Sequence, residues 1–157
     1  MILDMTCGSK STWFNKHPED TVFLDKRVEQ LTLCDGREIE VKPDVQADFC
    51  HLPFADNTFH LVLFDPPHLE RLGETSWMYA KYGALLPDWR DVLAQGFSEA
   101  FRVLKPSCAL IFKWNETQIP VKQIVELSPY PPMFGHRSGK ASKTHWLNFV
   151  KPGSPNE

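Results

Sequence analysis

Residues 59–68 of the sequence, FHLVLFDPPH, constrain the possible folds of this chain more than any other stretch. Five of the first six residues are apolar, which fits a strand buried on both faces in the middle of a parallel sheet. Asp65 and two prolines follow, and a proline has a fixed φ and no backbone N–H with which to continue the ladder. The pattern therefore predicts a central strand that ends abruptly in a carboxylate on a stiff turn.

Strand-like and helix-like segments alternate along the rest of the chain, which predicts an α/β fold with a mostly parallel central sheet and flanking helices. The segments expected to form further strands are 2–4, 21–25, 45–48, 108–114 and 144–150. The segments expected to form helices are 5–16 after a turn at Gly8, 88–104 with Asp88 as its cap, and 121–127. Lys105-Pro106 should end the second helix, and Asp35-Gly36 within 31–41 is a strong hairpin signal.

Length and composition are those of one ordinary globular domain, with 157 residues of which 42% are apolar and 24% charged. We expect the domain to cover residues 1–151, with nothing structural before it and a disordered tail at 152–157. The net charge of −3 provides no global basic field that would attract nucleic acid. Widely spaced cysteines, no signal peptide and no apolar stretch of membrane length predict a cytoplasmic protein without disulfides.

Acidic residues stand at the ends of four expected strands: Asp4, Asp25, Asp48 and Asp65. A single acid there is most often a helix cap or a turn residue. Four in succession favour a ligand site, because ligands of open α/β sheets bind beyond the carboxyl ends of the strands. Gly8 lies just after Asp4, where backbone can approach a ligand closely. Asp25 lies about 20 residues past Asp4, the spacing at which an acid reaches a ribose hydroxyl.

These segments together resemble a class I S-adenosylmethionine-dependent methyltransferase over nearly the whole chain. The stretch ILDMTCGS resembles the first motif of that family, VFLDK the second-strand motif, and ADFCHLPFADNTFHLVLFDPPH the adenine-contact and fourth motifs. EAFRVLKPSCALIF is similar to a segment that the family usually writes with RVLKPGG, although Ser107 and Cys108 replace the glycines. Ser9-Lys10 stands where a second loop glycine is common. The resemblance implies a Rossmann-like methyltransferase fold and S-adenosyl-L-methionine as cofactor.

The same resemblance implies roles for individual residues toward that cofactor. Asp25 would hold the ribose hydroxyls, and Asp48 and Phe49 would flank the adenine ring. The full set of cofactor-binding residues implied in this way is Asp4, Thr6, Gly8, Asp25, Lys26, Asp48, Phe49 and Asp65.

The turn Asp65-Pro66-Pro67-His68 resembles the D-P-P-aromatic motif of methyltransferases that modify exocyclic amino groups, typically adenine N6 or cytosine N4. Such an amine is a poor nucleophile because its lone pair is delocalised into the ring. The Asp65 carboxylate and the Pro66 carbonyl would accept its two N–H bonds and turn the lone pair toward the sulfonium methyl. Preorganised acceptors and alignment of the reacting atoms then supply the catalysis, with Asp65, Pro66 and His68 as the catalytic residues.

His68 departs from the family pattern, which usually has Tyr, Phe or Trp at this place to stack on the target base. Three roles remain open: stacking on the base, acid/base work with an unperturbed pKa of about 6.5, or a turn histidine without a chemical role. The other histidines show no metal-ligand spacing, so we expect no metal site.

Two segments hold candidate residues for contact with a nucleic acid or nucleotide substrate. Aromatic and basic residues suited to stacking and phosphate contact follow the D-P-P-H turn within 74–89, and basic residues lie on a Gly/Ser-rich loop within 136–146. The alternatives are aromatics that pack over the sheet and a solvated basic hairpin. The candidates are Trp77, Tyr79, Lys81, Tyr82, Arg137 and Lys140.

Three functions therefore compete. The first is N-methylation of a nucleobase in DNA, RNA or a nucleotide. The second is methylation of a small molecule or protein, favoured by LPFADNTFHLVLF, which looks like small-molecule methyltransferases. The third is a non-catalytic cofactor-binding module. Since the chain has no room for a recognition domain, we also expect a homodimer, the commonest way to widen a substrate surface.

Overall fold

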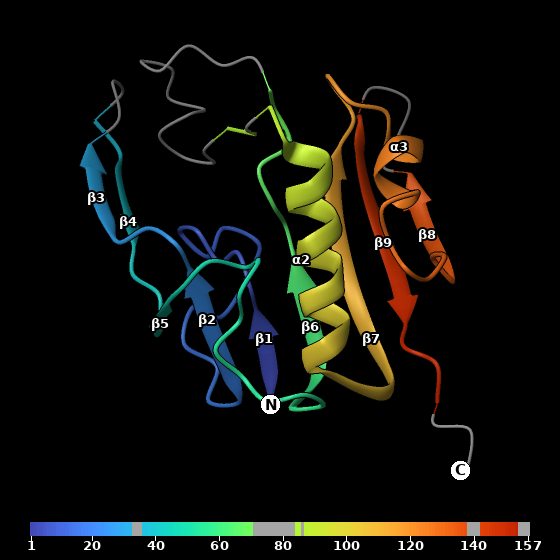
Figure 1. Ribbon diagram of the computed structural model, residues 1–157. Helices are drawn as coiled ribbons and strands as arrows, with labels where there is room; N and C mark the ends of the chain where they lie inside the picture. The colour runs from blue at the N-terminus through green and yellow to red at the C-terminus, as the bar shows by residue number, and fades with distance from the viewer. Residues whose placement is uncertain (33–35, 71–83, 86, 138–141, 154–157) are drawn as a thin grey trace.

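The computed structural model describes residues 1–32, 36–70, 84–85, 87–137 and 142–153. Within these ranges the protein has a mostly parallel sheet of seven strands flanked by helices. A separate two-stranded hairpin follows the second strand in chain order (Figure 1). This confirms the expected α/β fold. None of the described helices is long and apolar enough to cross a membrane.

Six strands precede the first described helix, so strands and helices alternate only in the second half of the chain. Their bounds are β1 Ile2–Asp4, β2 Thr21–Asp25, β3 Glu29–Thr32, β4 Glu38–Val41, β5 Val45–Gln46, β6 Phe59–Phe64, α2 Trp89–Val103, β7 Leu104–Asn115, α3 Val121–Val125, β8 Phe134–Arg137 and β9 Thr144–Val150.

The strands lie in the order β5-β2-β1-β6-β7-β9-β8. Pairing is parallel from β5 through to β7, whereas β9 is antiparallel to both of its neighbours. The chain runs outward from β1 on one side and from β6 on the other, so the order reverses between these two strands. Such a switch point is where a ligand crevice opens in an α/β sheet. The carboxyl ends of the parallel strands face away from the N-terminus, toward the top of Figure 1.

Strand β6 is the central buried strand that its sequence predicts. It lies between β1 and β7 and pairs in parallel with both. Phe59, Val62 and Phe64 are fully buried, and the Phe64 ring packs against rings from α2 and β7. The ladder stops at Phe64, directly before Asp65 and the two prolines, as the turn chemistry requires.

Helix α2 covers β6 and β7 with the apolar face expected from its spacing (Figure 1). The helix ends at Val103, just before Lys105-Pro106, as expected. Two details differ from expectation. Asp88 precedes the helix, but its side chain makes no capping hydrogen bond. The strand expected at 108–114 begins earlier, at Leu104, directly after the helix. Pro106 is tolerated there because the β6–β7 register is irregular at this point, between the pair at Phe59 and the pair at Leu61.

Residues 5–16 do not form the helix expected after Gly8; that prediction is wrong. They form successive turns, in which Lys10 N–H donates to the Cys7 carbonyl and Trp13 N–H to the Lys10 carbonyl. Gly8 and Lys10 have φ of 48° and 56°, which no α-helix accommodates. The buried Asp4 carboxylate accepts a hydrogen bond from the Trp13 indole at 2.7 Å and thereby draws the segment back onto the sheet.

The remaining sequence predictions concern the hairpin, the short second helix and the C-terminal tail. The hairpin expected within 31–41 exists as β3 and β4, while Asp35 lies outside the described residues. The helix expected at 121–127 ends at Val125. Of the expected disordered tail, residues 154–157 lie outside the described ranges.

Gly96 on α2 leads to a stability prediction. A Cβ at this position would lie 2.8 Å from Phe64 Cζ and 2.9 Å from Phe49 Cδ2, inside van der Waals contact with two packed rings. Alanine ordinarily stabilises a helix by up to about 1 kcal/mol relative to glycine, but overpacking a core costs about 1–3 kcal/mol. We expect Gly96→Ala to lower the free energy of unfolding in a urea titration. Ser98→Ala, on the exposed face of the same helix, is the control and should leave stability unchanged or slightly higher.

Candidate functional site

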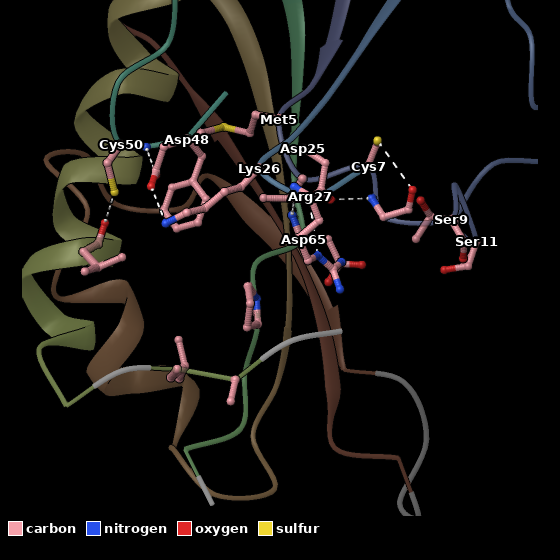
Figure 2. A pocket seen from close by; sticks show the side chains of 18 of the residues that line it. Met5, Cys7, Ser9, Ser11, Asp25, Lys26, Arg27, Asp48, Cys50 and Asp65 are labelled. Atoms are coloured by element: carbon pink, nitrogen blue, oxygen red, sulfur yellow. Dashed lines mark hydrogen bonds and ion pairs between the residues drawn. The ribbon is translucent and has the colours of Figure 1, made fainter. Parts of the chain in front are cut away.

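A cavity of about 370 Å³ opens at the carboxyl ends of β1, β2 and β6, beside the switch point (Figure 2). Its walls come from the segments that follow β1, β2, β5 and β6, closed on one side by the start of α2. The lining residues are Met5, Thr6, Cys7, Gly8, Ser9, Ser11, Thr12, Asp25, Lys26, Arg27, Asp48, Phe49, Cys50, Asp65, Pro67, Ala84, Leu85, Trp89 and Val92. A volume of this size suits a small organic ligand or cofactor.

The loop after β1 is fixed to the two strands beside it. Gly8 N–H donates to Asp25 Oδ2 at 2.9 Å, and Asp65 N–H donates to Thr6 Oγ1 at 2.8 Å. Gly8 has a φ of 48°, a conformation that glycine adopts without the strain a side chain would bring. The loop therefore holds the ends of β2 and β6 in fixed positions around the cavity.

Asp25 presents a buried, oriented carboxylate to the cavity. Its Oδ1 accepts hydrogen bonds from the Arg27 backbone N–H at 2.9 Å and from Arg27 Nε at 3.3 Å. The aspartate is 8% exposed, and the short ion pair with Arg27 balances its charge. Such a group can accept a hydrogen bond from a ligand hydroxyl without first reorganising.

Asp48 and Phe49, to which the resemblance assigns contact with an adenine ring, both line the cavity. Asp48 accepts hydrogen bonds from Cys50 N–H at 2.9 Å and from Lys26 Nζ at 3.0 Å. Partial burial raises the pKa of Asp48, but these two donors outweigh it and bring the pKa below its ordinary value. The Phe49 ring packs against Phe64 with centroids 5.2 Å apart. The carboxylate beside this ring is therefore held in its charged form.

Asp4 is the acid that the structure places apart from the cavity. It is 1% exposed, and its two carboxylate oxygens accept hydrogen bonds from Thr6 N–H and from the Trp13 indole. Burial, reinforced by the nearby Asp65 and Asp25 charges, raises the pKa of Asp4 to about 7 in spite of these donors. Asp4 is not among the lining residues, so its place is that of a support for the loop after β1.

Asp65 lines the cavity and is paired with a residue that sequence reasoning missed. Lys113 Nζ lies 2.7 Å from Asp65 Oδ2, and the two side chains are only 22% and 16% exposed. The pair forms because Phe64 and Phe112 are register partners on adjacent parallel strands, which places the next residues of both strands side by side. The sequence signal for this pair is a lysine within the apolar run CALIFKW, because a buried lysine needs a partner.

Pro66 and His68 do not line the cavity; only Pro67 of the turn does so directly after Asp65. The His68 ring packs edge-on against Trp114 with centroids 6.1 Å apart. Burial lowers the pKa of His68, and Lys113 lowers it further, while Asp65 and the Pro66 carbonyl oppose these effects. Of the three roles that the sequence left open, this placement favours a turn histidine without a chemical role.

The structure does not describe the side chains of the candidate substrate residues. Trp77, Tyr79, Lys81, Tyr82 and Lys140 lie outside the described residues, as does the side chain of Arg137, the last residue of β8. Their roles stay predictions. Trp89 and Val92 at the start of α2 line the cavity and were expected only as helix or core positions.

The raised pKa of Asp4 makes a pH-dependent prediction. An aspartate in the unfolded chain ionises near pH ~4, whereas Asp4 in the folded protein holds its proton until about pH 7. The folded state binds the proton more tightly, so the free energy of unfolding falls as pH rises between these values and is flat above them.

Asp4→Asn removes this ionisation. In urea titrations from pH 4.5 to 8, the stability difference between Asp4→Asn and wild type should move in favour of the variant as pH rises to about 7, and then level off. The lost acceptor for Trp13 or Thr6 shifts the variant's curve by an amount independent of pH, so the slope is the test. Parallel curves would contradict a raised pKa.

Comparison with known proteins supports the fold through structural similarity, not through sequence similarity. No protein-family model matches the sequence, and no curated protein matches it either. Among solved structures, the PH0226 protein of Pyrococcus horikoshii OT3 superposes with a TM-score of 0.61 at 16% identity, over 96% of this chain and 81% of that one.

Two further structures are methyltransferases by name. A SAM-dependent methyltransferase of Methanosarcina mazei gives a TM-score of 0.55 at 12% identity, over 98% of this chain and 92% of that one. The 1,6-didemethyltoxoflavin-N1-methyltransferase of Burkholderia thailandensis, solved with its substrate and S-adenosylhomocysteine, gives 0.56 at 12% identity, over 96% and 70%. This chain therefore has the Rossmann-like fold of S-adenosylmethionine-dependent methyltransferases.

Proposed function

We propose that this protein is an S-adenosylmethionine-dependent methyltransferase whose acceptor is an exocyclic amino group of a nucleobase, adenine N6 or cytosine N4, in DNA, RNA or a nucleotide. The observation that carries the proposal is that three oriented acids, Asp25, Asp48 and Asp65, line one cavity at the switch point of the sheet. The fold alone supports many functions, so the argument depends on this site.

The donor set of the cavity fits the proposed cofactor. A buried carboxylate at the end of β2 suits ribose hydroxyls, and in this proposal Asp25 accepts them. The Phe49 ring and the Asp48 carboxylate suit a purine, with the ring against its face and the carboxylate accepting its amino N–H. The methyltransferase of Burkholderia thailandensis, which shares the fold, holds S-adenosylhomocysteine. Bound S-adenosylmethionine supplies an electrophilic methyl group.

Asp65 is the residue that we propose for holding the methyl acceptor. Its backbone is tied to Thr6, and its side chain is tied to Lys113, so the carboxylate is fixed before the acceptor arrives. An amine that donates an N–H to this carboxylate has its lone pair directed away from it. As the nitrogen takes the methyl group and the carbon–sulfur bond of the sulfonium breaks, leaving a neutral thioether, positive charge would grow on the nitrogen. The Asp65 carboxylate would stabilise that charge until the nitrogen loses a proton to water.

The Pro66 carbonyl is a weaker second acceptor than its sequence suggests. Pro66 is not among the residues that line the cavity. We therefore propose Asp65 as the main acceptor of the amine N–H bond.

One observation favours a second candidate, a methyltransferase for a small molecule. The His68 ring packs against Trp114 and does not line the cavity, so the described site offers no ring at the position where the family stacks its target base. A small heterocycle held by polar contacts needs no such stacking. Mass spectrometry of nucleosides and of small-molecule extracts after incubation with methyl-labelled cofactor distinguishes the two candidates.

The cofactor half of the proposal is tested at Asp25. Asp25→Asn keeps the size of the side chain but removes the charge from its hydrogen bonds, each worth roughly 1.5–3 kcal/mol when charge-assisted. Affinity for S-adenosylhomocysteine in calorimetry should fall by about tenfold or more. Asp20→Asn, at an exposed acid outside the cavity, is the matched control and should bind as wild type does. Equal affinity in both variants would rule out the ribose role of Asp25.

The acceptor half is tested at Asp65. We expect Asp65→Ala to leave cofactor affinity nearly intact and to abolish measurable methyl transfer, because the carboxylate acts mainly as charge develops on nitrogen. Asp65→Asn should retain part of the activity, since its amide oxygen still accepts one hydrogen bond. Single-turnover kinetics with saturating cofactor measure the chemical step. A wild-type rate in Asp65→Ala would exclude the amino-methyltransferase proposal.

A further inference from the structure

A second groove adjoins the cavity and belongs to neither the proposed cofactor site nor Asp65. It lies between the loop after β1 and the β3–β4 hairpin and has a volume of about 520 Å³. Its lining residues are Ser9, Lys10, Ser11, Lys16, His17, Arg37, Glu38, Ile39, Glu40 and Lys42. Figure 1 shows the hairpin reaching beyond the carboxyl end of β2, on the side of the sheet where the cavity opens.

The groove is positively charged, although the chain as a whole is acidic. Four of its lining residues are lysine or arginine, against the two glutamates Glu38 and Glu40, while the whole chain carries −3. The cations come from both walls: two from the loop and two, Arg37 and Lys42, from the hairpin and the residue after it. Opposed cations across a groove are an arrangement that suits an anion between them.

Lys10 and Lys16 are held in place by groups that leave their charges unbalanced. Lys10 Nζ donates to the Lys16 carbonyl at 3.3 Å and lies 3.8 Å from the centre of the Phe23 ring. Lys16 Nζ donates to the carbonyls of Lys10 and Trp13. Within the described ranges no carboxylate lies in ion-pair distance of either ammonium group. Two like charges are thus fixed close together, and no counter-charge pairs with them in the part of the chain that the structure describes.

The backbone of this loop is strained at the same point. Lys10 has a φ of 56°, a left-handed conformation that is unfavourable for a non-glycine residue. The loop is kept in this shape by the bond from the Trp13 indole to the buried Asp4 and by the edge-on packing of Trp13 against Phe23. Strain together with fixed, uncompensated charge is typical of a binding loop.

The groove adjoins the cavity, because Ser9 and Ser11 of the loop after β1 line both. A molecule that reaches across this loop would have one part in the cavity and another in the groove. A neutral heterocycle has no anionic group that could occupy the groove, whereas a nucleobase attached to a phosphorylated sugar has its phosphate.

We propose that this groove binds a phosphate group of the methyl acceptor, between Lys10 and Lys16 on one wall and Arg37 and Lys42 on the other. The inference rests on the proposed function and narrows its substrate class to phosphorylated nucleobase compounds. The phosphate comes either from a single nucleotide or from the backbone of a nucleic acid strand. Ammonium and guanidinium groups recognise both in the same way.

The test uses the full chain saturated with S-adenosylhomocysteine and fluorescein-labelled single-stranded DNA and RNA 12-mers. Arg37→Glu/Lys42→Glu reverses two exposed charges of the groove, and Lys105→Glu reverses one at the amino end of β7, the opposite end of the sheet. Fluorescence anisotropy should show 12-mer binding at least tenfold weaker in the double variant than in wild type. The Lys105→Glu control should stay within about twofold of wild type.

Salt and competition measurements identify the source of the phosphate. The slope of log affinity against log salt should become shallower by about 0.7 for each lost contact to a single-stranded phosphate. Displacement of the 12-mer by adenosine monophosphate but not by adenosine supports a site filled by a single nucleotide. Failure of both to compete, with the 12-mer bound through Arg37 and Lys42, supports a strand backbone.

Two results overturn the inference: no phosphate compound binds the wild type, or the double variant and wild type bind the 12-mers equally. Calorimetry with S-adenosylhomocysteine and nucleoside mass spectrometry distinguish failure of the groove proposal from failure of the proposed function. Charge-dependent 12-mer binding without any methylated nucleoside would refute the proposed reaction and support the groove. Methylation of a 12-mer at wild-type rate and affinity by the double variant would support the reaction and refute the groove.

Discussion

The parallel pairing of β1 with both β2 and β6 is the constraint on which the rest of this structure depends. The strand is only three residues long, with Leu3 and Asp4 buried, yet it sets the register of Thr21–Phe23 on one side and of Leu61–Leu63 on the other. Parallel neighbours all end at the same edge of a sheet. The acids that end these strands therefore converge, and the effect of the Asp65 and Asp25 charges on the pKa of Asp4 is the electrostatic consequence.

The converging acids divide into a support and a set that faces the cavity. Asp4 is turned inward, where it holds Trp13 and with it the loop that contributes to both the cavity and the groove. Asp25, Asp48 and Asp65 face the cavity, and each is oriented by donors from the chain. A buried carboxylate is costly unless it is hydrogen-bonded. The donors that satisfy these groups also fix their positions for a ligand.

The ion pair between Asp65 and Lys113 changes the interpretation of the D-P-P-H turn. The motif by itself suggests a carboxylate and a carbonyl that both wait for an amine, followed by a ring that stacks on its base. In the folded protein a lysine from β7 pairs with the carboxylate, and neither Pro66 nor His68 lines the cavity. The proposed acceptor chemistry therefore depends mainly on the Asp65 carboxylate.

The sequence by itself determined the elements whose signals are local. An apolar run stopped by two prolines predicts β6, helical spacing of apolar residues predicts α2, and acids at strand ends predict the edge where the cavity opens. Each follows from burial and backbone geometry within about ten neighbouring residues. Most of the sequence-predicted cofactor residues line the cavity for the same reason, since they directly follow strands whose direction the alternating pattern already implies.

Only the tertiary structure decided the features that depend on distant partners. Lys113 meets Asp65 across 48 positions because of the register between β6 and β7, which no local pattern contains. The segment after Gly8 has helix-compatible residues, but the bond from Trp13 to the buried Asp4, together with the bond from Gly8 to Asp25, outweighs that propensity and makes it a strained loop. Helix propensity amounts to a few tenths of a kcal/mol per residue, whereas leaving a buried acid unsatisfied costs several times more. Tertiary contacts to buried polar groups therefore decided the shape of the site.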